Sequence, residues 1–344
     1  MPEGFARIAA VSLPVHLGDV EANEREIMLA LERLRTQGVQ AAVFPELCLT
    51  GYTLGDLLLH GLVQDRAWAA LKRLKAHTDG LTAVVGLPFC HEGRLYNCAA
   101  VLANGEIWAL VPKTYLPNYG EFYERRHFVP GPKEAFEITF AGQRTLFGTN
   151  LLFACREMPE FVLGVEICED LWATVPPSSS LALQGAEIIF NLSADDEGIG
   201  KHNYLCSLIS QQSARCISGY VFSSSGFGES TTDVVFAGNG LIYENGYLLA
   251  RSERFCLEEQ LIINEIDVEC IRAERRVNTT FAANKANCPG KEAVRISTEF
   301  VNSKDLNLTR TFNLHPFVPQ GSELNSRCEE IFSIQIAGLA QLSL

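Results

Sequence analysis

Short apolar stretches alternate with amphipathic helical stretches along most of the chain, and this order most constrains its fold. Arg7–Leu13 and Val39–Phe44 are apolar and rich in strand-forming residues, and the apolar residues of Glu21–Gln37 between them have helical spacing. The cycle repeats with a helix at Gln64–Lys75 and a strand at Thr82–Leu87. Strands and helices that alternate through short links are typical of α/β domains.

Two Asn-Gly turns predict that part of the sheet is antiparallel. Asn104-Gly105 separates predicted strands at Asn97–Leu102 and Glu106–Val111, and Asn245-Gly246 follows a further strand. The other predicted elements are strands at Leu151–Cys155, Phe161–Cys168, Ile188–Asn191, Tyr220–Ser224, Val234–Phe236 and Gly240–Tyr243, a turn at Val175–Ser180, and helices at Leu181–Gln184, Gly200–Cys216 and Glu329–Leu339. Arg272–Lys304 is charged and Asn-rich, and we expect it to form an extended arm or linker.

The composition excludes several classes of function. The chain has 344 residues, 47% of them apolar, which is enough for one large α/β domain or two smaller ones. Its net charge of −13 argues against binding nucleic acid through phosphate contacts. We see no apolar run near the roughly 20 residues that span a bilayer and no signal peptide. We therefore expect a cytoplasmic protein with neither nucleic acid nor membrane as a partner.

The cysteines and histidines do not form metal-binding patterns. The eleven cysteines are scattered without C-x-x-C spacing, which argues against zinc ribbons and redox pairs. Free thiols in a reducing compartment are therefore expected. Because the seven histidines form neither H-x-H nor H-E-x-x-H, we assign no metal.

Cys168 ends the apolar stretch Phe161–Cys168 and is followed at once by Glu169 and Asp170. A buried strand that delivers a cysteine to a turn presents a nucleophile well. The neighbouring carboxylates, however, disfavour the thiolate and raise the pKa of the thiol. A reactive Cys168 therefore needs a base and a compensating cation from elsewhere in the chain.

Two other predicted strands end at residues that supply these groups. Glu46 follows Val39–Phe44, and Lys113 follows Glu106–Val111. Taken singly, Glu46 is typical of a strand-end carboxylate and Lys113 of a surface lysine. Because sites in α/β sheets gather at strand ends, we expect both to meet Cys168 there. Glu46 would take the thiol proton, Lys113 would bind the developing oxyanion and Cys168 would attack a carbonyl, which is acyl transfer.

Three long motifs resemble the nitrilase superfamily of carbon–nitrogen hydrolases, whose catalytic triad is Glu-Lys-Cys. They are P-E-L-C-L-T-G-Y at Pro45–Tyr52, K-T-Y-L-P-N-Y-G-E-F-Y-E-R-R at Lys113–Arg126 and G-V-E-I-C-E-D-L-W at Gly164–Trp172. With Asn191–Ser193, they are most similar to one branch, the glutaminase domain of glutamine-dependent NAD synthetases. The resemblance covers nearly the whole chain. It implies an α/β fold, the superfamily's α-β-β-α sandwich of two mixed sheets flanked by helices, and a homo-oligomer.

The resemblance also implies roles for the strand-end residues. Glu46 matches the general base, Lys113 the oxyanion stabiliser and Cys168 the nucleophile. Superfamily members often have a second glutamate after the lysine, and we assign that position to Glu124 rather than Glu121. The alternative for Glu124 is a salt bridge to a flanking arginine.

The glutamine-binding positions implied by the resemblance are Tyr52, Tyr119, Phe122 and Glu169. The backbone N–H of Glu169 would complete the oxyanion hole, and its side chain would bind the α-ammonium group. Two residues depart from the family pattern: Asp195 replaces the second serine of N-L-S-x-S, and Lys201 stands where arginine is common. Because lysine is a poorer bidentate clamp than arginine, how the α-carboxylate is held is left open.

The chain contains neither the S-G-G-x-D-S loop of the family's synthetase half nor G-x-x-x-x-G-K-[ST]. We therefore expect a hydrolase domain at residues 1–267, an extended arm or linker at 268–322 and, at 323–344, the start of the connection to an absent synthetase domain. The resemblance implies that this half needs no cofactor and hydrolyses L-glutamine through a thioester. The released ammonia would serve a synthetase domain that uses ATP, Mg and deamido-NAD to make NAD.

Three alternatives stay open. The chain could be a free-standing amidase of the same superfamily that acts on another ω-amide or a carbamoyl compound. It could be a Cys–His hydrolase that uses His127 or His202. It could also be a non-catalytic assembly or regulatory module.

Overall fold

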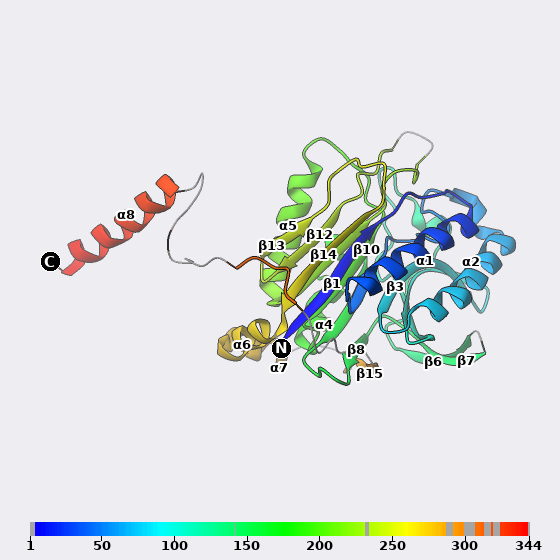
Figure 1. The fold of residues 1–344 in the computed structure, drawn as a ribbon, viewed down its shortest axis with the longest axis horizontal. Coiled ribbons are helices and arrows are strands. Elements are labelled where there is room, and N and C mark those ends of the chain that lie inside the picture. Colours follow the sequence, from blue (N-terminus) through cyan, green and yellow to red (C-terminus); the bar gives the residue numbers. More distant parts are fainter. Residues whose placement is uncertain are drawn as a thin grey trace. The chain divides into compact units, whose positions relative to one another are not determined.

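The computed structural model describes residues 4–140, 142–230, 234–286, 292–298, 307–312, 318 and 324–342. The chain divides into two compact units, Met1–Leu308 and Thr309–Leu344. The larger unit contains two β-sheets and the helices that cover them (Figure 1). The smaller unit contains one described helix, α8 Leu324–Leu342.

The first sheet has eight strands in the order β14-β1-β2-β3-β4-β5-β7-β6. Its strands are β1 Phe5–Ser12, β2 Ala41–Val43, β3 Thr82–His91, β4 Arg94–Ala103, β5 Glu106–Pro112, β6 Phe136–Phe140, β7 Gln143–Phe147 and β14 Gln260–Asp267. β1, β2 and β3 are parallel to one another, whereas β3, β4 and β5 are antiparallel. The sheet is therefore mixed, and the hairpin predicted at Asn104-Gly105 is confirmed.

The second sheet has seven strands in the order β13-β12-β11-β10-β9-β8-β15. Its strands are β8 Leu151–Cys155, β9 Val162–Ile167, β10 Ile188–Ser193, β11 Gly219–Ser224, β12 Gly240–Glu244, β13 Tyr247–Arg251 and β15 Val294–Thr298. β9, β10 and β11 are parallel, and β12 and β13 form the hairpin at Asn245-Gly246. β9 is parallel to β10 and antiparallel to β8, so the carboxyl end of β9, where Cys168 follows, lies at the border of the parallel part of this sheet.

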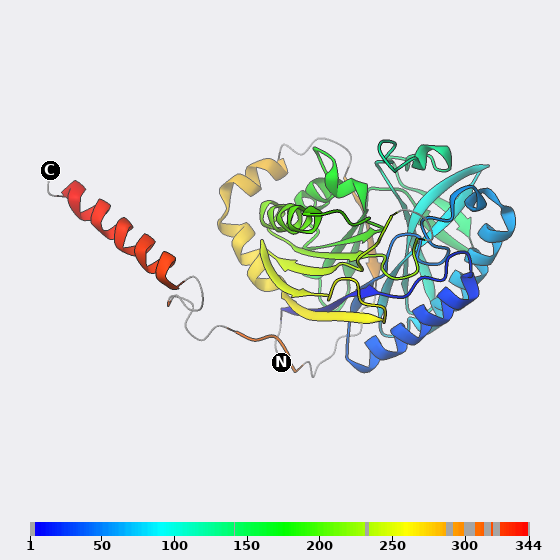
Figure 2. The same cartoon turned by 90° about the horizontal axis from the view of Figure 1, so that it is seen from above.

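Helices cover the outer face of each sheet, so the layers follow the order α-β-β-α (Figure 2). α1 Val20–Thr36 and α2 Gly61–Leu74 pack on the first sheet, and α4 Pro177–Leu183 and α5 Lys201–Cys216 pack on the second. The shorter helices are α3 Glu169–Trp172, α6 Val268–Val277, α7 Thr279–Ala286, η1 Gly55–Leu59, η2 Lys75–His77 and η3 Glu124–Arg126. The α/β sandwich of two mixed sheets flanked by helices is therefore confirmed.

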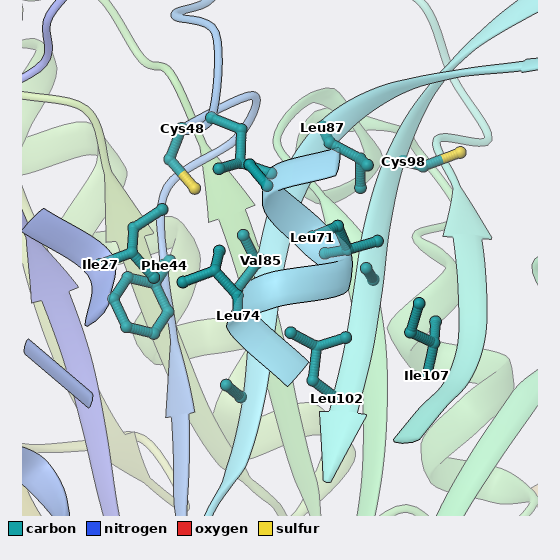
Figure 3. Close-up of a cluster of buried hydrophobic side chains, with 14 of the residues drawn as sticks. Ile27, Phe44, Cys48, Leu71, Leu74, Val85, Leu87, Cys98, Leu102 and Ile107 are labelled. Atoms are coloured by element: carbon teal, nitrogen blue, oxygen red, sulfur yellow. The ribbon is translucent and has the colours of Figure 1, made fainter. Parts of the chain in front are cut away.

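The apolar core fills each space between these layers. Figure 3 shows part of the outer core, where Ile27 of α1 and Leu71 of α2 meet Phe44, Val85 and Leu102 from the first sheet and its connections. The strands between the layers are buried on both faces, which explains their nearly continuous apolar sequences. α1 begins at Asp19, whose side chain accepts a hydrogen bond of 3.0 Å from Ala22 N, as N-cap residues do.

Several predicted elements differ from the structure. Val234–Phe236 is not a strand, because Phe236 forms only an isolated bridge with Asp196. The turn predicted at Val175–Ser180 includes the start of α4, since proline is tolerated in the first turn of a helix. The strands β6, β7, β13, β14 and β15 were not predicted.

The predicted extended arm is also partly wrong. α6 and α7 occupy Val268–Ala286, and β15 pairs with β8. Asp267 caps α6 by accepting a 2.8 Å hydrogen bond from Cys270 N, while Val268 and Ile271 are buried. Val268 and Ile271 are the buried residues among the ten of α6. The rest of the segment is mostly charged, and for this reason it was predicted to be an extended arm. The boundary of the hydrolase domain at residue 267 and that of the arm or linker at residue 322 stay predictions.

α8 confirms the helix predicted at Glu329–Leu339. Its described side chains are exposed. Among the described residues, no helix is both long and apolar enough to cross a membrane.

Candidate active site

Glu46 lies in the turn after β2 and is completely buried. The turn packs directly on β3, where a Cβ at Gly86 would lie 2.3 Å from Leu47 N, so a side chain at position 86 would displace it. Glu46 Oε2 accepts a 2.9 Å hydrogen bond from Ala194 N, and Oε1 accepts one of 2.6 Å from Asn97 Nδ2. Both sheets therefore hold this carboxylate in place.

Lys113 follows β5 and is also completely buried. Its Nζ lies 2.7 Å from Glu46 Oε1 and 2.6 Å from Glu124 Oε1. The Tyr52 hydroxyl donates a further 2.8 Å hydrogen bond to Glu124 Oε1. One buried cation thus joins two buried carboxylates, the arrangement in which a buried charge is tolerated.

Glu124 does not pair with the flanking arginine that was considered as the alternative. Arg126 instead binds both carboxylate oxygens of Asp56, at 2.6 and 2.7 Å. The Glu124 side chain turns inward to Lys113, and its second oxygen, Oε2, is buried without a protein partner.

The charges in this cluster do not cancel. Burial raises the pKa of Glu124 to about 7. The positive charge of Lys113 acts to lower this pKa, and the negative charge of Glu46 acts to raise it. Burial lowers the pKa of Lys113, but Glu124 and Glu46 outweigh it and hold that pKa well above its ordinary value. Lys113 therefore stays charged, and Glu124 exchanges a proton near neutral pH.

Cys168 follows β9 in a strained turn, with φ 44° and ψ −99°. Its backbone N–H donates to Leu192 O at 2.8 Å and to the Asn191 side chain at 3.1 Å. Burial and the charge of Glu46 raise the pKa of its thiol, against the opposite effect of Lys113. The resting form is therefore the thiol, and its proton has to leave when the sulfur attacks.

The backbone N–H of Glu169 begins α3, and the first N–H groups of a helix have no acceptor within it. This leaves it able to donate to an oxyanion beside Cys168. The N–H of Cys168 itself is already bonded to Leu192 and Asn191.

A buried chain of polar groups supports the turn at Cys168. Asn191 Nδ2 donates to the Tyr220 hydroxyl at 3.0 Å, and that hydroxyl donates to Glu166 Oε1. Glu166 Oε2 accepts from Ser178 N at 2.7 Å. Sequence analysis missed Glu166 and Tyr220, because nothing in their spacing indicates that they meet.

Asp170 was also missed, although it links the two strands that carry Lys113 and Cys168. Its carboxylate accepts hydrogen bonds of 2.8 Å from Tyr115 N, 3.1 Å from Thr114 N and 3.0 Å from Ile167 N. Burial raises its pKa to about 8. Because β5 and β9 belong to different sheets, Asp170 fixes the position of the carboxyl end of β5 relative to the carboxyl end of β9.

Glu229 holds the backbone at Tyr52 in place, as Asp170 does for the backbone after β5. Its Oε1 accepts from Tyr52 N at 2.7 Å and from Thr53 N at 2.8 Å, and burial raises its pKa to about 7. Tyr52, Phe122 and Glu124 line a cavity of about 440 Å³. The structure therefore places a space for a small molecule beside the Lys113–Glu124 pair.

The other predicted substrate contacts lie around Glu169. The Tyr119 hydroxyl donates to both Glu169 oxygens, at 2.9 and 3.0 Å, and the Phe122 ring meets the Tyr119 ring edge-on. Burial raises the pKa of Glu169, against the hydrogen bond from Tyr119. Three of the predicted substrate contacts, Tyr119, Phe122 and Glu169, thus lie together.

Asp195 and Lys201 lie together but bind each other. Lys201 Nζ is 2.8 Å from Asp195 Oδ1 and also donates to Asp196 Oδ1 at 2.6 Å and Asp196 O at 2.8 Å. Burial raises the pKa of Asp195 to about 6, although Lys201 acts to lower it. A substrate carboxylate would have to compete with two aspartates for this lysine.

The two histidines considered for a Cys–His pair have other partners. His127 Nε2 contacts Asp56 at 2.9 Å, and His202 contacts Asn239 and Cys206. Glu46, which acts on the pKa of Cys168 and is bonded to Lys113, is better placed to be the base. A carboxylate, a lysine and a thiol in this arrangement can cleave an amide by acyl transfer.

Comparison with known proteins agrees with this chemistry. Residues 7–276 match the family model of carbon-nitrogen hydrolases. A glutamine-dependent NAD(+) synthetase of Mycobacterium tuberculosis is 39% identical over 344 residues, which cover 98% of this chain and 51% of that protein. A putative glutamine-dependent NAD(+) synthetase of Schizosaccharomyces pombe is 27% identical over 285 residues, which cover 79% of this chain and 40% of that protein. The chain spans about half the length of the curated relatives it matches, or less.

Solved structures of other proteins have a similar fold. The glutamine-dependent NAD(+) synthetase of Cytophaga hutchinsonii has a TM-score of 0.68 and 27% sequence identity, and the match covers 76% of this chain and 43% of that one. An amidase of Nesterenkonia AN1 from the nitrilase superfamily has a TM-score of 0.61 and 20% identity, over 81% of this chain and 98% of that one. The second likeness concerns the fold alone.

Proposed function

Because this chain belongs to the carbon–nitrogen hydrolase family, as its three motifs predicted, we propose that it hydrolyses the side-chain amide of glutamine through a thioester on Cys168. The observation that carries the proposal is the buried cluster of Glu46, Lys113 and Glu124 beside the strained turn that presents the thiol. The names of the relatives support glutamine as the substrate, and the geometry of the cluster supports the residue roles in the steps proposed below.

In the first half-reaction, the Cys168 sulfur attacks the amide carbon while Glu46 accepts the thiol proton. The oxyanion is bound by Lys113 Nζ and the Glu169 N–H. Glu46 then passes the proton to the amide nitrogen, the carbon–nitrogen bond breaks and ammonia leaves. A γ-glutamyl thioester remains on Cys168.

In the second half-reaction, Glu46 removes a proton from water, and the resulting hydroxide attacks the thioester carbon. The same two donors bind the second oxyanion. Its collapse breaks the carbon–sulfur bond, releases glutamate and returns the proton to Cys168. Glu124, whose pKa is close to 7, holds Lys113 in place throughout both steps.

For the substrate, we propose that Glu169 binds the α-ammonium group, with Tyr119 holding its carboxylate. Tyr52 and Phe122 would enclose the side chain in the cavity that they line. The hydrolysis itself would need no cofactor.

In the whole protein, we propose that the ammonia passes to a synthetase domain that uses ATP, Mg and deamido-NAD to make NAD. The proposed hydrolase domain is residues 1–267, followed by the connection through 268–322 and 323–344. We further propose a homo-oligomer in the cytoplasm.

One observation favours a second candidate, an amidase acting on an ω-amide or carbamoyl compound without a free carboxylate. Lys201, which was expected to hold the α-carboxylate, is bound to Asp195 and Asp196. An amide with a neutral end would not have to compete with those two aspartates.

The test is ammonia release by the wild-type protein from L-glutamine and from butyramide, beside Cys168→Ala and the matched control Cys206→Ala. We expect release from glutamine that disappears in Cys168→Ala and persists in Cys206→Ala. Release from butyramide alone would support the second candidate. A folded protein that releases ammonia from no amide would contradict both and favour the non-catalytic module.

A further inference from the structure

A second thiol in the chain has a base beside it. Cys206 and His202 are four residues apart on α5, so their side chains lie on the same face of the helix. Cys206 Sγ lies 3.5 Å from His202 Nε2, an ordinary hydrogen-bond distance for sulfur. Both residues are partly exposed, and Cys206 packs against the apolar cluster between α5 and the second sheet.

The neighbours of His202 determine which ring nitrogen carries the proton. Glu197 is held by Arg254 at 3.1 Å, and its Oε2 accepts a 3.3 Å hydrogen bond from Asn239 Nδ2. Because a carboxylate only accepts, this contact fixes the orientation of the Asn239 amide. Its Oδ1 then faces His202 Nδ1 at 3.0 Å.

This contact assigns the tautomer of His202. An amide oxygen only accepts hydrogen bonds, so Nδ1 of His202 is the protonated nitrogen. Nε2 therefore presents its lone pair to the Cys206 sulfur. The thiol donates to Nε2, and the imidazole is oriented to take its proton.

We propose that Cys206, His202 and Asn239 form a second thiol site, at which a peroxide oxidises Cys206 to a sulfenic acid. His202 Nε2 takes the thiol proton, and the sulfur attacks one peroxide oxygen. The sulfur–oxygen bond forms as the oxygen–oxygen bond breaks, so sulfur is oxidised and the peroxide is reduced. The proton on His202 passes to the departing hydroxide, which leaves as water.

The site differs from a single exposed cysteine because the base is oriented by a chain of partners ending at Arg254. It also differs from Cys48 and Cys98, whose burial raises the pKa of each thiol and closes it to solvent. Cys328 on α8 is an exposed cysteine of the same chain and provides an internal reference.

The test treats the full wild-type chain with hydrogen peroxide, traps sulfenic acid with dimedone and quantifies each cysteine by peptide mass spectrometry. General-base assistance predicts that Cys206 is trapped at least about tenfold faster than Cys328. Equal rates for the two cysteines in the folded protein would overturn the proposal. This comparison needs no substitution and therefore does not depend on the folding of a variant.

Two variants then assign the base. His202→Gln should lower the Cys206 rate to that of Cys328, and Asn239→Ala should lower it severalfold because the imidazole is no longer oriented. His60→Gln, at an exposed histidine before α2, is the matched control and should leave the rate unchanged. A folded His202→Gln protein that keeps the fast rate would contradict the role of the imidazole.

Discussion

We propose a base for each of two thiols in the part of the chain that the structure describes, and the surroundings of these two thiols differ. Cys168 is buried at a strand end, where its proposed base is the Glu46 carboxylate, which is itself bonded to Lys113. Cys206 is partly exposed on a helix, where its proposed base is the His202 imidazole oriented by Asn239. A buried thiol next to carboxylates needs a buried cation before it can lose its proton. A thiol near water needs only a correctly oriented base, because solvent supports the charge.

We expect the largest effect on ammonia release from a substitution that removes the carboxylate base. Glu46→Gln keeps the size of the side chain but cannot accept the thiol proton, so ammonia release should fall on the order of 10³-fold. Steady-state kinetics with the best amide measures this fall. Peroxide labelling of Cys206 should not change, because its base is His202. Retained activity in folded Glu46→Gln would place the base elsewhere and revive the Cys–His alternative.

Asp170→Asn tests whether the buried site depends on the link between sheets. The asparagine cannot accept all three backbone N–H groups, so Lys113 should shift relative to Cys168 and kcat should fall about 100-fold. KM for the amide should change less than threefold, since the cavity lining is untouched.

A purely structural role for Asp170 would lower the amount of folded protein without changing kcat per folded molecule. Asp65→Asn, at an exposed position of α2, is the matched control and should behave as wild type. Active-site titration of the Cys168 thiol supplies the concentration of folded enzyme in each case.

Asp195→Ser tests which substrate end lies near Lys201. Removing one of its two aspartate partners should free Lys201 for a carboxylate and lower KM for glutamine about fivefold. KM for butyramide should not change, because that amide has no carboxylate. An unchanged KM for glutamine would mean that Lys201 does not contact the substrate.

The smallest effect concerns stability against pH. Burial raises the pKa of Glu124, Glu187 and Glu229 to about 7 and that of Asp170 to about 8. Between pH 5 and pH 8 the folded state therefore binds more protons than the unfolded state, so the free energy of unfolding should fall as pH rises. The fall should be on the order of 1 kcal/mol or more.

Urea unfolding at pH 5.5 and pH 8.5 measures this difference. Glu187→Gln removes one of these carboxyl groups, at a site near Arg272 rather than the cavity, and should reduce the pH dependence. Greater stability at pH 8.5 than at pH 5.5 would show that these carboxyl groups are not protonated in the folded state.

Sequence analysis named Glu46, Lys113 and Cys168 because each one ends an apolar strand and because the motifs around them resemble a family with a Glu-Lys-Cys triad. Glu124 was named from the resemblance, and the structure brings it together with Glu46 and Lys113. Asp170 lies two residues after Cys168 in the motif Gly164–Trp172, but its role depends on backbone groups more than fifty residues away, after a strand of the other sheet. No periodicity carries that information.

The same reason explains the missed elements of the fold. β6 alternates exposed and buried residues over only five positions, so its apolar pattern is too short to identify. α6 buries only Val268 and Ile271 in ten residues. His202 and Cys206 have the spacing of a helical pair, but Asn239 reaches them only through the packing of the second sheet's connections.

The division of the active site between two sheets has a consequence for refolding. Glu46 and Lys113 come from the first sheet, Cys168 and Asp170 from the end of a strand in the second, and Ala194 N bonds to Glu46 across the boundary. In a chain recovering from urea, these groups meet only when the two sheets pack against each other. Amide hydrolysis would return only when the sheets have packed together. The rate at which activity recovers would therefore measure the last step of folding.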